Sequence, residues 1–501
     1  MALAHVLTVQ PHVLSGTIIK IEADIARGLH AFSIVGLAGK AIDESKDRVS
    51  SAIKHSAFES PKTKNQKIVI SMSPADLKKE GPLFDLPIAI AYLKAAEEIT
   101  IDDVPRIYIG ELGLDGSIRK VKGVLNCVLA ARDAGVTEVI VPKDNAVEAA
   151  LVEGITVIPA SDLRSVLEHI KTTEGKLLLL AQPPTQLAED WYESSVTLED
   201  IKGQESAKRG LIIAAAGRHN VMFVGPPGTG KTMLARALRG LLPPLSRKEA
   251  LAVTAIHSLV RDDTEITTRP PFRAPHHTAS HTALVGGGTH PKPGEVTLAH
   301  YGVLFMDEFP EFERRSLDAL RQPLEDRVVS ISRVQGSAEF PADFLLVAAL
   351  NPYRGSEDGT SDLARAMRET YKNKVSGPIL DRIDLWLEVP HVDYDTLTTL
   401  RTENGETEAA RAQVLGARER MLARQGDRGT NNTLSARDIE ELLYLSDEVK
   451  DLLKISSAKL NLSPRSYHRL IKVARTIADL DSSEHIEPSH VLEALQYRVP
   501  L

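Results

Sequence analysis

Apolar runs with β-strand character alternate with helical stretches over residues 1–171, and this alternation predicts a mixed α/β domain. The expected strands are Gly16–Glu22, Lys67–Met72, Arg106–Gly110, Glu138–Val141 and Thr156–Pro159. The expected helices include Leu86–Ala96 and Val124–Ala134.

A second α/β pattern begins near Leu198, after a stretch with the composition of a linker at 172–195. Strands separated by helical crossovers predict a parallel sheet with its ligands at the carboxyl edge. The expected elements are a helix at Gln204–Ala216, a strand at Asn220–Val224, a helix at Met233–Leu241, and strands at Gly302–Met306 and Phe344–Leu350.

After Val392 the pattern becomes wholly helical. Thr396–Gln425 is charged and amphipathic, Gly426–Asn432 interrupts it, and Leu434–Val499 is typical of a compact helical lid. We therefore predict a mixed domain at 1–171, a linker at 172–195, a parallel-sheet core at 196–392 and a lid at 393–501.

The composition is that of a soluble globular protein, and it narrows the classes of function. The 501 residues carry a net charge of −8, which excludes a generally basic nucleic-acid binder but leaves room for a local basic channel. Cys127 is the single cysteine, so no disulfide framework is possible within one chain. With no secretory signal or membrane span visible, we expect a cytoplasmic protein without a membrane partner.

The residues Gly225-Pro226-Pro227-Gly228-Thr229-Gly230-Lys231-Thr232 fit the pattern Gly-x-x-x-x-Gly-Lys-Ser/Thr. The glycines let backbone N–H groups turn inward around phosphates, and the following helix dipole favours anions. Lys231 is expected on the β- and γ-phosphates and Thr232 on Mg²⁺. The other interpretation is a simple Gly/Pro-rich turn, but an apolar strand before and a helix after favour an ATP site.

An apolar strand further along ends in Asp307 and Glu308. After a phosphate-binding loop, this pair predicts Asp307 on Mg²⁺ through water and Glu308 orienting the attacking water. Solvated carboxylates at a strand end are the alternative.

Three more residues are candidates for sensing or neutralising the γ-phosphate. Asn351 ends a strand, although a helix-capping Asn before Pro352 is also possible. Arg382 is a candidate arginine finger, or else an ion-pair partner of Asp381 or Asp384. Arg465 in the lid is a candidate contact to phosphate from above, or else a surface arginine.

With these motifs the chain resembles the YifB/ComM group of magnesium-chelatase-like AAA+ ATPases, over nearly its whole length. The specific segments are Arg273–Thr278, Gly286–Gly288, Lys292–Glu295, Ser376–Leu385, Ser463–Leu480, Phe32–Leu37, Lys79–Pro82 and Phe84–Pro87. The resemblance implies that Asn351 is sensor 1, that Arg382 acts on a neighbouring subunit, and that Arg465 is sensor 2. It also implies a homo-oligomeric ring, a hexamer, that uses ATP and Mg²⁺.

The same resemblance implies DNA translocation or branch migration during homologous recombination or natural transformation. Candidate DNA contacts are Arg273, His276, His277 and Lys292 in an insertion at Arg269–Leu298 that also holds His281 and His290, and Arg333 in a hairpin-like segment at Val328–Phe340. Metal binding by the histidines and plain structural packing are the alternatives. A chelatase-type or protein-remodelling motor without direct DNA activity is the alternative function.

The N-terminal domain resembles the Lon-protease-like (ribosomal S5 domain 2-like) fold. Leu83 stands where Lon proteases have the nucleophilic Ser, so Lys120 and Lys122 have no catalytic partner and peptidase activity is not expected. The chain also departs from the family at Tyr353–Lys374, which lacks the cysteines that suggest zinc, and at Arg327, where glycine is usual.

Overall fold

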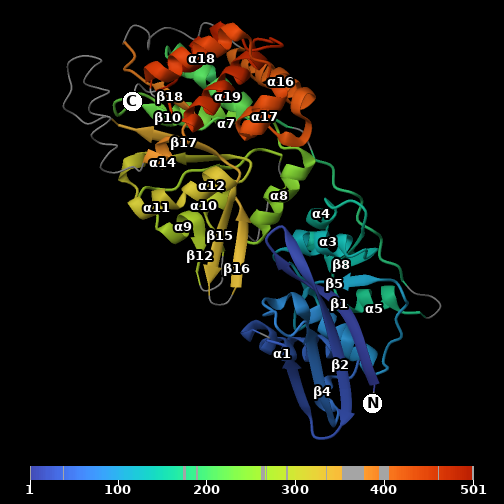
Figure 1. The fold of residues 1–501 in the computed structure, drawn as a ribbon. Helices are drawn as coiled ribbons and strands as arrows, with labels where there is room; N and C mark the ends of the chain where they lie inside the picture. The colour runs from blue at the N-terminus through green and yellow to red at the C-terminus, as the bar shows by residue number, and fades with distance from the viewer. Residues whose placement is uncertain are drawn as a thin grey trace. The chain divides into compact units, whose positions relative to one another are not determined.

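The computed structural model describes residues 2–37, 39–172, 177–187, 190–260, 266, 268–288, 292–333, 336–351, 377–393, 405–460 and 462–498. The chain divides into two compact units (Figure 1). Unit 1 contains Met1–Ala188 and Ala250–Thr267, and unit 2 contains Glu189–Glu249 and Thr268–Leu501.

Unit 1 is built on a seven-stranded mixed sheet in the order β3-β4-β2-β1-β5-β8-β9. The β1–β2 and β2–β4 pairs are antiparallel, and the β3–β4, β1–β5, β5–β8 and β8–β9 pairs are parallel. Its strands are β1 (Ala2–His12), β2 (Ser15–Arg27), β3 (Ala31–Val35), β4 (Gln66–Ser73), β5 (Arg106–Tyr108), β8 (Glu138–Pro142) and β9 (Thr156–Ala160), with a small β6 (Glu111–Leu112) and β7 (Ile118–Arg119) pair beside them.

Helices complete the core of unit 1. They are α1 (Lys40–His55), α2 (Asp85–Ala95), α3 (Val124–Asp133), α4 (Ala146–Ala149) and α5 (Leu163–Ile170). Helix α2 is buried almost throughout, which explains why its sequence is a continuous apolar run rather than an amphipathic one. Leu83 lies just before α2 and is buried, so an apolar side chain packs at this position.

Unit 2 contains a five-stranded sheet in the order β11-β14-β17-β10-β18, and all of its strand pairs are parallel. The strands are β11 (Phe272–Arg273), β14 (Val303–Met306), β17 (Leu345–Leu350), β10 (Val221–Val224) and β18 (Leu385–Glu388). Strands β10, β14 and β17 are fully buried, which matches their unbroken apolar sequences. The parallel sheet predicted from the sequence is confirmed.

Helices and a small strand pair lie before and between the strands of the unit 2 sheet. They are α6 (Glu205–Gly217), α7 (Lys231–Leu241), α9 (His281–Val285), α10 (Glu295–Leu298), α11 (Arg314–Ala319), α12 (Arg321–Asp326) and α14 (Gly377–Leu380), with a β12 (Gly286–Gly287) and β13 (Lys292–Pro293) pair. Helix α8 (Arg247–Ser258) continues into the residues assigned to unit 1. Strands β15 (Val328–Arg333) and β16 (Gly336–Pro341) form the antiparallel hairpin expected from the sequence.

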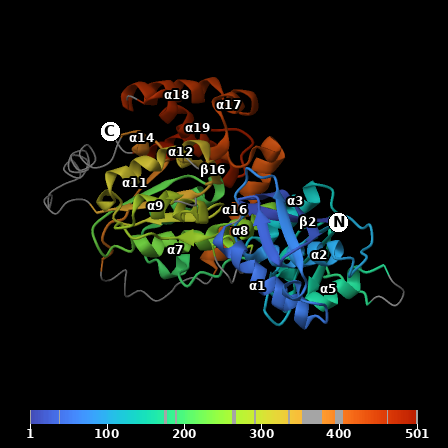
Figure 2. The same ribbon diagram turned by 90° about the horizontal axis from the view of Figure 1, so that it is seen from below.

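The C-terminal part of unit 2 is helical, as predicted, and forms a layer beside the sheet (Figure 2). Its helices are α16 (Glu406–Gln425), α17 (Ala436–Leu442), α18 (Asp447–Leu460), α19 (Pro464–Leu480) and α20 (Pro488–Gln496). One apolar core joins this layer to the sheet, because Leu470 and Ile477 of α19 belong to the same buried cluster as Val221 and Phe223 of β10. In the part of the chain that the structure describes, none of the helices has the length and apolarity needed to span a bilayer.

Candidate nucleotide-binding site

The glycine-rich loop follows β10 at the carboxyl edge of the unit 2 sheet. Gly228 and Gly230 have φ of 80° and 91°, a region that L side chains rarely adopt. A Cβ at Gly225 would lie 2.1 Å from the carbonyl oxygen of Val389, so only glycine fits there without displacing backbone. The loop therefore has the open backbone that a chain of phosphates requires.

Lys231 begins α7, and its side chain turns back into the loop. Its Nζ donates to the carbonyl oxygens of Gly225 at 2.9 Å and Pro226 at 2.7 Å. An ammonium has three N–H donors, so one remains for a phosphate oxygen. Burial lowers the pKa of Lys231, and the nearby Asp307 opposes that effect. An anion bound in the loop would stabilise the charged form of Lys231, which burial disfavours.

Two oxygen donors meet beside the loop. Thr232 Oγ1 lies 3.3 Å from Asp307 Oδ2, and the other carboxylate oxygen, Oδ1, accepts from the backbone N–H of Glu308 at 2.9 Å. Hydroxyl and carboxylate oxygens are the ligands that Mg²⁺ prefers. Both residues fit a magnesium ion held between the protein and a nucleotide.

Asn351 follows β17, the strand between β14 and β10. It therefore lies between Asp307 and the glycine loop at the same edge. Its Oδ1 is buried without a hydrogen-bond partner among the described residues. This oxygen is free to accept a hydrogen bond from the attacking water, and a flip of the amide, which exchanges oxygen and nitrogen, would present a donor to a phosphate instead. Asp307, Asn351 and the glycine loop thus follow three neighbouring strands at one edge of the sheet.

Glu308 follows β14 with φ of 50° and has a partner that sequence reasoning did not identify. His277 Nδ1 lies 3.1 Å from Glu308 Oε2. The two side chains are partly exposed. His277 was expected at a DNA surface; the structure places it on the carboxylate expected to orient water.

Arg382 and Arg465 lie at the opposite edge of the sheet. Asn220, which precedes β10, donates from Nδ2 to the carbonyl oxygen of Arg382 at 3.0 Å, whereas the glycine loop follows β10. A four-residue strand spans roughly 13 Å. The structure therefore does not place Arg465 above the glycine loop of its own chain, as the sequence had suggested.

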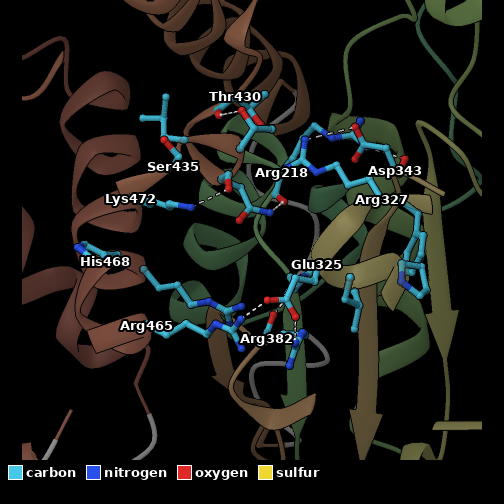
Figure 3. A pocket seen from close by; sticks show the side chains of 18 of the residues that line it. Arg218, Glu325, Arg327, Asp343, Arg382, Thr430, Ser435, Arg465, His468 and Lys472 are labelled. Carbon is cyan, nitrogen blue, oxygen red and sulfur yellow. Dashed lines mark hydrogen bonds and ion pairs between the residues drawn. The ribbon is translucent and has the colours of Figure 1, made fainter. Parts of the chain in front are cut away.

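Both guanidinium groups bind the same carboxylate (Figure 3). Arg382 Nη2 donates to Oε2 of Glu325, and Arg465 Nη2 donates to Oε1. Partial burial raises the pKa of Glu325, but the two guanidinium groups outweigh this effect and the pKa lies below its ordinary value. The alternative interpretation of Arg382, an ion pair with Asp381 or Asp384, is not found among the described contacts; Asp384 instead lies 3.6 Å from both His219 and Arg469.

These arginines border a cavity of about 650 Å³ between the core and the lid of unit 2. Its lining is rich in cations: Arg218, Arg327, Arg382, Arg465, Arg469 and Lys472. Burial lowers the pKa of Lys472 to about 8, with Arg469 and Arg327 contributing in the same direction. The cavity therefore favours anionic groups. Arg327 adopts φ of 59°, a left-handed conformation that favours glycine.

The remaining candidate DNA contacts have different surroundings. Arg273 makes two hydrogen bonds to Glu295, at 2.6 and 2.7 Å, so its charge is balanced within the chain. His276 is exposed and its Nδ1 lies 2.9 Å from Thr278 Oγ1. Lys292 is exposed on β13.

Parts of the predicted site lie outside the described residues. They are His290, the side chain of Arg333 and the stretch Tyr353–Lys374. Within the described ranges, no three His, Cys, Asp or Glu side chains are grouped closely enough to hold a metal ion by themselves.

A parallel five-stranded sheet with a phosphate-binding loop after β10, an Asp-Glu pair after β14, a polar residue after β17 and a helical C-terminal region defines an AAA+ P-loop fold. Three family descriptions match the chain. They are magnesium chelatase subunit ChlI at residues 197–397, subunit ChlI of Mg-chelatase at 21–145, and the ChlI C-terminal region at 404–498.

The chain is 43% identical to competence protein ComM of Haemophilus influenzae, over 99% of this chain and 98% of the relative. It is also 43% identical to protein YifB of Escherichia coli, over 96% and 94% of the two chains. A more distant match, 22% identical over 59% of this chain, is the maternal DNA replication licensing factor mcm6 of Xenopus tropicalis. The chain belongs to the magnesium-chelatase-like ComM/YifB family.

Proposed function

We propose that this chain is a cytoplasmic ATPase that assembles into a closed homo-oligomeric ring, a hexamer, and drives DNA translocation or branch migration in homologous recombination or natural transformation. One observation supports the ring most strongly. The phosphate-binding loop and the arginines expected to complete hydrolysis lie at opposite edges of one parallel sheet. A single chain cannot bring them together, whereas a second copy placed edge to edge can.

Each residue at the carboxyl edge has a distinct task in this proposal. The loop N–H groups and Lys231 bind the phosphates of ATP, and Thr232 and Asp307 hold the position of Mg²⁺. The metal supplies charge neutralisation for the transferred phosphate when it is bound. Glu308 orients the attacking water, and Asn351 contacts the γ-phosphate or that water.

Arg382 and Arg465 act on the nucleotide of the neighbouring subunit. The structure holds both guanidinium groups on Glu325 at the edge of the cationic cavity. A phosphate from the neighbour offers the same kind of anionic oxygen that Glu325 offers within the chain. When the neighbouring subunit binds, the two guanidinium groups therefore exchange the Glu325 carboxylate for a phosphate of the neighbour's nucleotide.

The DNA assignment is supported by the relatives and by the hairpin. One relative is named for competence and another for DNA replication licensing. The β15–β16 hairpin begins one residue after Arg327, which lines the cavity that holds Arg382 and Arg465. A structural change at the subunit interface can therefore be transmitted to the hairpin through Arg327, which directly precedes it in the chain.

A chelatase-type or protein-remodelling motor is the second candidate, because the matching family descriptions are those of a magnesium chelatase subunit. The two candidates differ in their response to DNA. ATP hydrolysis by the purified protein should be compared with and without single-stranded and three-strand branched DNA, over a range of salt concentrations. The DNA motor predicts stimulation that weakens as salt rises, and a rate unaffected by either DNA contradicts it.

A branch-migration assay on a three-strand junction provides the direct test. Wild-type protein should resolve the junction only with ATP and Mg²⁺, and the Lys231→Ala variant should not. If the variant resolves the junction as fast as the wild type, the movement is not driven by the proposed ATP site.

A further inference from the structure

His277 and Glu308 lie after two neighbouring strands of the unit 2 sheet. Strand β11 pairs in parallel with β14, with Phe272 opposite Val303 and Arg273 opposite Leu304. The strands end at Arg273 and Met306, so His277 and Glu308 both lie beyond the carboxyl ends of two neighbouring parallel strands. Their side chains meet there, with His277 Nδ1 3.1 Å from Glu308 Oε2.

The chemistry of the contact fixes its direction. An ionised carboxylate accepts hydrogen bonds and donates none, so the Nδ1 of His277 is the donor to Oε2 of Glu308 at 3.1 Å. A carboxylate has two oxygens, and holding one of them sets the direction in which the other points. Glu308 lies two residues after Met306, the last residue of β14, in a left-handed backbone conformation, so the pairing of that strand does not fix its side chain.

The ordinary alternative is a surface pair with no consequence. Exposed pairs usually contribute little to stability, and the His277 and Glu308 side chains are 32% and 47% exposed. A pair that contributes little to stability can still affect catalysis, because small displacements of a reacting group strongly alter the reaction rate.

We infer that His277 is a positioning residue for Glu308: its Nδ1–H holds one carboxylate oxygen so that the other faces the water that attacks ATP. This inference rests on the proposed ATPase function. It replaces the expected role of His277 as a DNA contact. The residue that positions Glu308 thus belongs to the segment following β11, outside the strand that carries Glu308 itself.

The geometry allows a graded test with three substitutions. In His277→Asn the amide nitrogen takes the place of Nδ1, because both atoms are attached to Cγ. In His277→Gln the amide nitrogen lies one bond further out, where Nε2 lies, and in His277→Ala no donor remains. We expect the kcat for ATP hydrolysis to fall about tenfold in the Ala variant and to recover more in Asn than in Gln. The KM for ATP and the affinity for a non-hydrolysable analogue should stay within twofold of wild type.

Two controls separate positioning from folding. His485→Ala removes an exposed histidine that contacts Tyr444 in the lid, and it should leave kcat unchanged. The double variant His277→Ala/Glu308→Gln should be no slower than Glu308→Gln alone, because the first substitution acts through the second residue.

The possible outcomes are distinct. A kcat within twofold of wild type for His277→Ala, or an Asn variant no faster than the Ala variant, overturns the positioning role while leaving the ATPase function intact. A parallel rise in KM also overturns it, because that result assigns His277 to nucleotide binding. If wild-type protein hydrolyses no ATP under any of these conditions, both the proposed function and this inference fail.

Discussion

Thr232 and Asp307 meet at the carboxyl edge of the unit 2 sheet, with 3.3 Å between Thr232 Oγ1 and Asp307 Oδ2. Thr232 belongs to the helix after the glycine loop, and Asp307 follows a different buried strand. Two segments far apart in sequence therefore contribute adjacent oxygens at one point. This contact supports a Mg²⁺–nucleotide site built across two strands of one sheet.

Lys231→Ala should abolish ATP binding. The buried ammonium has two loop carbonyl partners and one remaining donor for phosphate, and the substitution removes the charge that attracts the nucleotide. We expect the affinity for a fluorescent ATP analogue to fall at least about 100-fold. Lys248→Ala, which alters an exposed lysine, is the matched control and should bind normally. Equal affinity of the two variants for the ATP analogue would contradict the assignment of the glycine loop as the ATP-binding site.

Glu308→Gln should bind ATP with normal affinity and lose turnover. The amide keeps the shape of the side chain but no longer accepts a proton from water, so kcat should fall by a factor of about 10² or more. The measurement is steady-state hydrolysis together with equilibrium nucleotide binding. Normal turnover would remove Glu308 from its assigned role.

Gly225→Ala should be more harmful than Gly228→Ala. A Cβ at Gly225 meets the Val389 carbonyl oxygen at 2.1 Å, whereas a Cβ at Gly228 meets nothing within 4 Å and only the positive φ disfavours it. We expect the Gly228 variant to lose about 1–2 kcal/mol through backbone strain, and the Gly225 variant to lose more stability and most nucleotide affinity. Thermal unfolding and ATP binding measure both effects; the reverse order would contradict the loop geometry.

Glu199 contributes stability that depends on pH. Its carboxylate accepts hydrogen bonds from the backbone N–H and the hydroxyl of Thr407 near the start of α16. Partial burial raises its pKa, but these hydrogen bonds outweigh that effect and lower the pKa to about 2 from an ordinary 4.5. Because the folded-state pKa is depressed, the stabilisation is present above pH 4.5 and is lost as the pH falls towards 2.

Glu199→Gln should therefore lower the free energy of unfolding by roughly 1 kcal/mol at pH 7, since the site is partly exposed. The difference from wild type should shrink as the pH falls from 4.5 towards 2. Denaturant unfolding at several pH values measures it, and Glu193→Gln, at an exposed residue, is the control. A constant difference across this pH range would show that the charge is not the cause.

Sequence reasoning recovered the features with strong local signals. The glycine loop has a fixed spacing, and the apolar strands before the loop, Asp307 and Asn351 are unbroken runs that are buried in the structure. The alternating pattern of Ala4, Val6 and their exposed neighbours also marks β1, yet that strand was not among those predicted.

Contacts that depend on tertiary register were not predictable in the same way. Strand β11 has only two residues, so its pairing with β14, and with it the contact of His277 with Glu308, has no periodic signal. The acids nearest to Arg382 in sequence are Asp381 and Asp384, but the carboxylate that binds its guanidinium group is Glu325 of α12. Such long-range pairs are set by packing of separate elements, which local sequence does not encode.

The central claim is that ATP bound by one subunit is hydrolysed with Arg382 of the next, and mixing two inactive variants tests it most directly. Arg382→Ala should bind ATP nearly as well as wild type, because its own glycine loop remains intact. It should hydrolyse none, because no subunit then supplies the arginine to its neighbour, although Glu308 is still present. Mixed with Glu308→Gln subunits, which retain Arg382, it should recover part of the wild-type rate, since some interfaces then contain both groups. Inactivity at every mixing ratio, in assemblies shown to contain both variants, would contradict hydrolysis across a subunit interface.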